Sequence, residues 1–242
     1  MGTNICKNCN YQTNDEFCPK CGHPIKIERI DRHYIVYEIK EVLFTNSGFL
    51  FTIKRLLTNP GESIRQYITE DRSRYVKPIT FLIITSLIYT LVNHFFHIGT
   101  PSLSTQQSET EFPTVKLFLN WMVDYHGYSS MISGLIIAFW VKLFFRKSGY
   151  NLFEIFVLLC FVSGIMSFCF SFIQILQGLT HLELTRISLL IAFIYHIWAI
   201  GQFFDKRKAE SYIKAFFSFV LGIVSFSVLV TLIGMFIDMI IK

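Results

Sequence analysis

Long apolar segments alternate with short polar ones over the last two thirds of the chain. Each apolar segment holds about 20 residues, the length that an α-helix needs to cross the hydrocarbon of a bilayer. Helices are expected, because an open sheet cannot satisfy its backbone hydrogen bonds in lipid. The pattern predicts an all-α membrane bundle at residues 78–242, with about five transmembrane helices at 78–98, 128–145, 152–176, 187–204 and 215–241.

Ahead of the first span, apolar residues recur at helical spacing, but charged residues lie between them. One such stripe covers residues 35–43 and is broken by Asn46-Ser47-Gly48; a second covers residues 49–57 and is ended by Asn59-Pro60-Gly61. Both segments are too short and too charged to span a bilayer. Residues 27–77 are therefore predicted to form cytoplasmic amphipathic helices. They either lie in the membrane interface, where basic residues meet anionic headgroups, or pack on the ends of the bundle, and both could hold together.

Composition and charge are typical of a protein that lies in the lipid bilayer, which is its expected partner. Of the 242 residues, 52% are hydrophobic and only 16% are charged, whereas soluble domains have about 25% charged residues. Lys and Arg predict the orientation, because cytoplasmic loops carry their excess. With the N-terminus inside, the inner segments 1–77, 146–151 and 205–214 hold 18 of them, and the outer segments hold three. We expect a cytoplasmic N-terminus, an extracytoplasmic C-terminus and no nucleic-acid partner.

Four of the six cysteines lie in the first 21 residues, as the C-x2-C pairs Cys6/Cys9 and Cys18/Cys21. Thiols stay reduced in the cytoplasm, so cysteines that cluster there are metal ligands more often than disulfides. Two such pairs supply four thiolates that can converge on one ion with tetrahedral geometry. Residues 1–26 are therefore predicted to form a zinc ribbon with one zinc ion per chain. Four thiolates leave no open coordination position, so this zinc is expected to be structural.

Ionisable residues within the spans are candidates for a polar site, because they are costly at membrane depth. Glu154 lies near the inner end of the third span, and its expected partners are Lys142 on the preceding span or Arg146 and Lys147 in the turn. The two alternatives for Glu154 are a structural ion pair at the interface and a proton or ion relay. His196 lies halfway along the fourth span and needs a hydrogen-bond partner inside the bundle.

Two further groups of polar residues, four histidines and three serines, are candidates for a site because of where they lie in the spans. Four histidines lie near the outer ends of the spans: His94, His97, His126 and His181. If they converge, they could bind a transition metal such as Zn or Cu, and otherwise they are ordinary interfacial residues. Three serines share one face of the third span and either allow close helix packing or line a polar path: Ser163, Ser167 and Ser171.

The motifs ahead of the first span follow a recognisable order. After Cys6-x2-Cys9 and Phe17-Cys18-Pro19-x-Cys21-Gly22 come Arg29-Ile30, Thr52-Ile53-x-Arg55-Leu56-Leu57-x-x-Pro60-Gly61, Ile64-Arg65-x-Tyr67-Ile68 and Arg72-x-Arg74-Tyr75-x-x-Pro78. This order resembles the bacterial family labelled domain of unknown function 3667. The resemblance implies a multi-span membrane protein with a cytoplasmic zinc ribbon and no assigned activity. The chain departs from the family pattern at Glu70-Asp71, where Gly-Lys is usual, and at Ile155, where His often follows the glutamate.

The sequence contains no phosphate-binding loop, zinc-protease, hydrolase or dinucleotide motif, so an enzyme is the less favoured interpretation. The leading hypothesis is a non-enzymatic inner-membrane protein. In it, the ribbon and the amphipathic helices form a docking or regulatory module for an unidentified cytoplasmic protein. The alternative is a channel, transporter or membrane-disrupting protein that uses the helix bundle, as an oligomer of this chain.

Overall fold

A computed structural model of the chain describes residues 4–5, 11–13, 18–21, 48–70, 72–96, 113–180, 182 and 184–241. The chain divides into two units, Met1–Thr45 and Asn46–Lys242. In the first unit, strands β1 (Asn4–Ile5) and β2 (Gln12–Thr13) pair in antiparallel fashion, with Asn4 opposite Thr13. The predicted helix at 35–43 lies outside the described residues.

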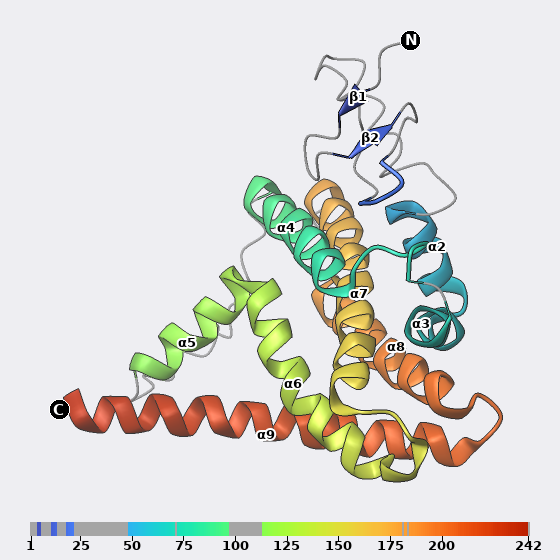
Figure 1. Cartoon of the computed structure of the whole chain (residues 1–242). Helices are drawn as coiled ribbons and strands as arrows, with labels where there is room; N and C mark the ends of the chain where they lie inside the picture. Colours follow the sequence, from blue (N-terminus) through green and yellow to red (C-terminus); the bar gives the residue numbers. More distant parts are fainter. Residues whose placement is uncertain are drawn as a thin grey trace. The chain divides into compact units, whose positions relative to one another are not determined.

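In the second unit, every regular element of the described residues is a helix (Figure 1). Its helices are α2 (Phe49–Thr58), α3 (Pro60–Thr69), α4 (Pro78–Phe96), α5 (Pro113–Asp124), α6 (His126–Phe144), the short 3-10 helix η2 (Arg146–Ser148), α7 (Leu152–Thr180), α8 (Thr185–Asp205) and α9 (Ala209–Ile241). Five of them, α4, α6, α7, α8 and α9, are long and apolar enough to cross a membrane. The predicted helical bundle with five candidate spans is therefore confirmed, and it is compatible with a multi-pass membrane protein.

Two of the spans extend four or more residues beyond a predicted end. The helix α9 starts at Ala209 instead of 215, and α7 continues to Thr180 instead of 176. The added turns of α9 hold charged residues, which a search for apolar segments leaves out. Lys214 and Glu210 are one turn apart there and form an ion pair at 2.5 Å, so the helix continues beyond its apolar part.

The core is best packed where α4 and α7 lie side by side (Figure 1). Gly164 of α7 faces Phe81 and Leu82 of α4, and a Cβ atom at this glycine would lie 2.7 Å from the Phe81 ring. The Phe81 and Phe161 rings pack at 6.0 Å between centroids, and both side chains are fully buried. A small residue at the crossing thus allows the close approach that membrane helices use to gain packing contacts.

The hairpin α2–α3 packs against α7 and α8. Leu56 and Ile64 are each only 1% exposed, and the Tyr67 ring packs edge-on against Phe161 at 5.1 Å. Burial raises the pKa of the Tyr67 hydroxyl, so it stays protonated at neutral pH. The second amphipathic stripe therefore takes the predicted alternative in which it packs on the bundle.

The sequence did not predict α3 as a separate helix, because its residues are mostly polar and Asn59-Pro60-Gly61 indicates the end of the preceding helix. Pro60 is the first residue of α3, where its fixed backbone and missing N–H are tolerated. Gly61 then donates its N–H to Oε1 of Gln202 at 2.8 Å, and Arg65 Nη1 donates to the carbonyl of Phe203 at 3.0 Å. These contacts with α8 hold a helix that has little apolar surface of its own.

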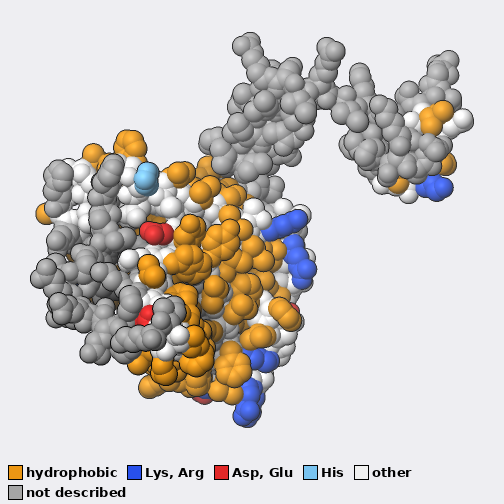
Figure 2. All heavy atoms as spheres, turned by 90° about the vertical axis from the view of Figure 1, so that its left-hand side faces the viewer, with side chains coloured by type: hydrophobic (Ala, Val, Ile, Leu, Met, Phe, Trp, Pro, Cys, Tyr) orange, Lys and Arg blue, Asp and Glu red, His pale blue; other side chains and the backbone are white. Residues whose placement is uncertain are grey.

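The basic links between the spans lie at one end of the bundle. The Phe145 ring stacks on the Phe204 ring at 3.8 Å, which places the link 146–148 beside the link 206–208. Figure 2 shows Lys and Arg side chains along one edge of this unit, beside a broad hydrophobic face. The orientation predicted from charge requires these basic links to lie at the same end of the bundle.

Candidate functional site

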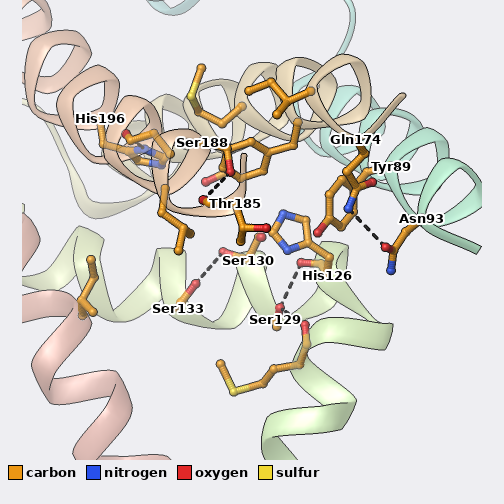
Figure 3. A pocket seen from close by; sticks show the side chains of 18 of the residues that line it. Tyr89, Asn93, His126, Ser129, Ser130, Ser133, Gln174, Thr185, Ser188 and His196 are labelled. Carbon is orange, nitrogen blue, oxygen red and sulfur yellow. Dashed lines mark hydrogen bonds between the residues drawn. The ribbon is translucent and has the colours of Figure 1, made fainter. Parts of the chain in front are cut away.

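A cavity of about 540 Å³ lies within the bundle (Figure 3). All helices from α4 to α9 contribute to its wall. It extends from the middle of the bundle towards the end where α4 and α7 finish and α6 and α8 begin. This end is opposite the basic links. The volume falls in the range of sites that hold small-molecule ligands.

Polar side chains make up more than half of the residues that line the cavity, although they belong to apolar helices. They are Tyr89, Asn93, His126, Ser129, Ser130, Ser133, Ser163, Gln174, Gln177, Thr185, Ser188 and His196. None of the described residues that line it is Asp, Glu, Lys or Arg. With no carboxylate to compensate an imidazolium, we expect both imidazoles to be neutral. The wall therefore offers hydrogen bonds but no formal charge.

One end of the cavity has an acceptor that is not satisfied. Gln174 Nε2 donates to Oδ1 of Asn93 at 3.2 Å, while Gln174 Oε1 is buried and has no hydrogen-bond partner in the described part of the chain. Close to it, the rings of Tyr89 and His126 lie 4.8 Å apart, and the His126 imidazole extends from α6 into the cavity (Figure 3). A buried acceptor without a donor costs about 1–3 kcal/mol. Because Gln174 Oε1 is closed off from the cavity, the His126 imidazole is the group at this end that extends towards a bound molecule.

His196 lies deeper in the cavity wall. Its Nδ1 is 2.8 Å from the carbonyl of Ala192, one turn earlier in α8, and its ring stacks on Phe219 at 4.7 Å. If Nδ1 donates to this carbonyl, the neutral ring has Nε2 as an acceptor. The hydrogen-bond partner expected for His196 is thus a backbone carbonyl of its own helix.

Glu154 and Lys142 were predicted as partners, and the structure gives each a different one. Glu154 Oε2 accepts from the Asn151 N–H at 2.7 Å, and Asn151 Oδ1 accepts from the Glu154 N–H at 2.8 Å. This reciprocal pair caps the start of α7. Lys142 Nζ donates to the carbonyl of Tyr150 at 2.5 Å. Both residues lie at the turn between α6 and α7 and do not join His196 in one polar site.

The histidines of the predicted outer metal site are described only in part. His94 is exposed, whereas His126 lines the cavity. His97 and His181 lie outside the described residues. Within the described parts, no three metal-binding side chains come together. A metal site built from all four histidines therefore stays a prediction.

The serine face of α7 divides between the two predicted roles. Ser163 lines the cavity. Ser167 and Ser171 are buried, and their hydroxyls donate to the carbonyls of Ser163 and Ser167, each at 3.0 Å. The first serine thus faces a polar space, while the other two pack inside the bundle.

Sequence reasoning missed the polar face of α6. His126, Ser130, Ser133 and Ile137 follow one another at helical spacing and all line the cavity. The signal was a polar stripe inside an otherwise apolar segment, which predicts a face turned away from lipid.

The described parts of the N-terminal unit lie around the predicted zinc ligands. Strands β1 and β2 flank the first cysteine pair, and residues 19–21 form a turn within the second. Cys18 is 1% exposed and Cys21 is exposed. Cys6 and Cys9 lie outside the described residues, so the four-thiolate site stays a prediction.

Residues 46–90 match the model of a family described as a protein of unknown function (DUF3667). The match covers α2, α3 and most of α4 and confirms the family label suggested by the motifs in this part of the chain. The cysteine pairs lie outside the matched residues. No curated protein and no solved structure matches the chain.

Proposed function

We propose that the chain is a multi-pass membrane protein that takes up a small uncharged solute in its bundle cavity and passes it across the membrane. The observation that carries this proposal is a cavity of about 540 Å³ whose wall has hydrogen-bonding side chains from α4, α6, α7 and α8 and, among the described residues, no charged one. A wall that only filled space would be apolar, because unpaired polar groups are costly in a bundle core.

The chemistry of the wall favours uncharged ligands. A charged solute would lose its hydration and meet no opposite charge. An uncharged one exchanges hydrogen bonds with water for bonds with hydroxyl, amide and imidazole groups, at little net cost. Aromatic rings such as Phe170 and Phe219 also line the cavity, and they can pack against C–H surfaces. Small polyols and sugars have this combination of groups.

The charge bias supports a cytoplasmic N-terminal unit and an insertion into the inner membrane. In that orientation, the basic links lie inside, and the cavity lies towards the extracytoplasmic end.

Flux of uncharged solutes into proteoliposomes tests the transport proposal. The full chain is reconstituted, and swelling is followed by light scattering after a jump in glycerol, erythritol or xylitol, with potassium glutamate as the charged comparison. We expect faster swelling with at least one uncharged solute and none with glutamate. Ser163→Phe adds a phenyl ring to the cavity and should lower the flux. Ser227→Phe, on the exposed face of α9, is the matched control and should retain it.

Two results would contradict the transport proposal. One is the absence of flux for all three polyols from a correctly inserted, helical protein. The other is equal flux from the Ser163→Phe and wild-type proteins, because an added phenyl ring at position 163 takes up part of the cavity and narrows any path through it.

A second candidate function is docking of a cytoplasmic protein by the N-terminal unit. The supporting observations are the strand pair around the first cysteine pair and the turn at the second. Four thiolates at this spacing suit one structural zinc, whose binding would supply most of the folding free energy of so short a unit.

Zinc content and co-purification test the docking function together. We expect one zinc per wild-type chain, none in the Cys18→Ser, Cys21→Ser variant, and loss of any partner with the zinc. Cys169→Ser, in α7, is the control and should keep both. Retention of zinc by the double variant would contradict the site, and an unchanged set of partners would contradict docking.

A further inference from the structure

A second, smaller cavity of about 240 Å³ lies at the hairpin α2–α3 and the link that leads into α4. Its wall consists of Phe51, Arg55, Gln66, Glu70, Arg74 and Tyr75. Among the described residues of the two walls, this one holds two arginines and one glutamate, whereas the wall of the bundle cavity holds no charged residue.

Glu70 lines the same cavity, but among the described residues the guanidinium of Arg55 forms no ion pair. Within the described part of the chain, its partners are the Gln66 amide oxygen, which accepts from Nη2 at 3.1 Å, and the Phe51 ring, 5.9 Å from Cζ. Its Nε is buried and makes no hydrogen bond among the described residues. A cation that is partly removed from water needs an anion, and an unpaired N–H adds to that need. The C-terminal end of α2, where Arg55 lies, compensates only a fraction of a charge.

Neighbouring side chains hold the guanidinium in place. The Gln66 oxygen that accepts from Arg55 also accepts from the Tyr75 hydroxyl at 3.2 Å. The Phe51 ring packs on the Tyr75 ring at 5.3 Å. A guanidinium fixed in this way loses little freedom when a ligand binds, and its planar fork matches the oxygens of phosphate.

We propose that this cavity binds a phosphate group, with Arg55 as the main ligand and Arg74 as a second source of positive charge. The site lies just ahead of Pro78, where the first candidate span begins. Lipid phosphates lie at that level of a bilayer, so the group can belong to a lipid headgroup, and free phosphate offers the same chemistry.

Thermal-shift titrations of the full chain in phosphate-free mild detergent test the site. The probes are inorganic phosphate and dioleoylphosphatidylglycerol, with dioleoylglycerol as the lipid that lacks phosphate. A ligand that binds the folded state raises the unfolding temperature, and its dissociation constant follows from the titration. Arg55→Gln should weaken binding by about tenfold or more, because it removes a charge-assisted hydrogen bond. Lys54→Gln removes one exposed charge from the neighbouring position and should change binding by less than about threefold.

The two probes distinguish the sources of the phosphate. Stabilisation by phosphatidylglycerol but not by inorganic phosphate identifies a headgroup site, and stabilisation by inorganic phosphate in the absence of lipid identifies a soluble ligand. Arg55→Lys keeps the charge but loses Nε and the planar fork, so it should also bind more weakly, and it decides the matter if Arg55→Gln does not fold. The proposal is overturned if neither probe stabilises the wild type, or if Arg55→Lys binds as the wild type does.

Discussion

The contact between α3 and α8 provides the sharpest test of the packing, through Gly61→Ala. A Cβ atom at position 61 would lie 2.4 Å from the Gln202 carbonyl carbon and 2.5 Å from the Phe203 nitrogen. These are backbone atoms, so they cannot rotate away as a side chain can. To restore an ordinary contact of 3.4 Å or more, the two helices must move about 1 Å apart.

That separation breaks two hydrogen bonds. The Gly61 N–H to Gln202 Oε1 bond is 2.8 Å long, and the Arg65 Nη1 to Phe203 carbonyl bond is 3.0 Å long. Their loss costs about 2–4 kcal/mol together. Alanine favours a helix over glycine by up to about 1 kcal/mol. We therefore expect Gly61→Ala to lower the free energy of unfolding by about 1–3 kcal/mol.

Unfolding in mixed micelles of a mild detergent and dodecyl sulfate, followed by helix content, measures this change. Gly134→Ala is the matched control, because a Cβ at this buried glycine of α6 would meet its nearest neighbour at 3.6 Å, an ordinary contact distance. The control should be neutral or slightly stabilised by helix propensity. Equal stability of the Gly61→Ala and Gly134→Ala proteins would refute the close approach of α3 to α8.

Two helix caps give further predictions. Asp238 accepts from both the N–H and the hydroxyl of Thr114 at the start of α5, so Asp238→Asn should destabilise that helix end by about 1 kcal/mol and speed hydrogen exchange in residues 113–124. Unchanged exchange there would count against the cap. Asn151→Ala should cost about 0.5–2 kcal/mol at the start of α7, and adding Glu154→Ala should cost less than its separate effect, since the two residues cap reciprocally. Strict additivity in unfolding experiments would contradict this pairing.

The sequence predicted the spans well because length and hydropathy are properties of a single segment. All five candidate helices contain their predicted apolar core, and the errors lie at the ends. Charged turns such as Glu210 to Lys214 extend a helix without adding hydrophobicity. The same reasoning misjudged Glu154, because a residue in the first turn of an apolar helix can cap it instead of entering the membrane.

The cavity could not be predicted from one segment at a time. Its polar residues come from four helices, α4, α6, α7 and α8, and a serine or glutamine within a span is ordinary when taken alone. Only the packing of α6 against α7 and α9 brings Ser133, Ser163 and Phe219 to the same space. The polar stripe on α6 was the one signal of the cavity that a single segment contained. Likewise, α3 depends on its contacts with α8 more than on its own apolar pattern.

The polar side chains around the cavity differ in how many of their hydrogen-bonding groups the protein itself satisfies. A serine or threonine inside a helix can satisfy its hydroxyl on a carbonyl of the preceding turn, as Ser188 does on Thr185 at 2.7 Å. An amide or imidazole carries two bonding groups, and one carbonyl or one neighbour satisfies only half of it. Gln174, with one group bonded to Asn93 and the other unpaired, shows this imbalance directly. The hydroxyls therefore shape the cavity, whereas the His126 imidazole, which extends into it, has the remaining capacity to select what enters.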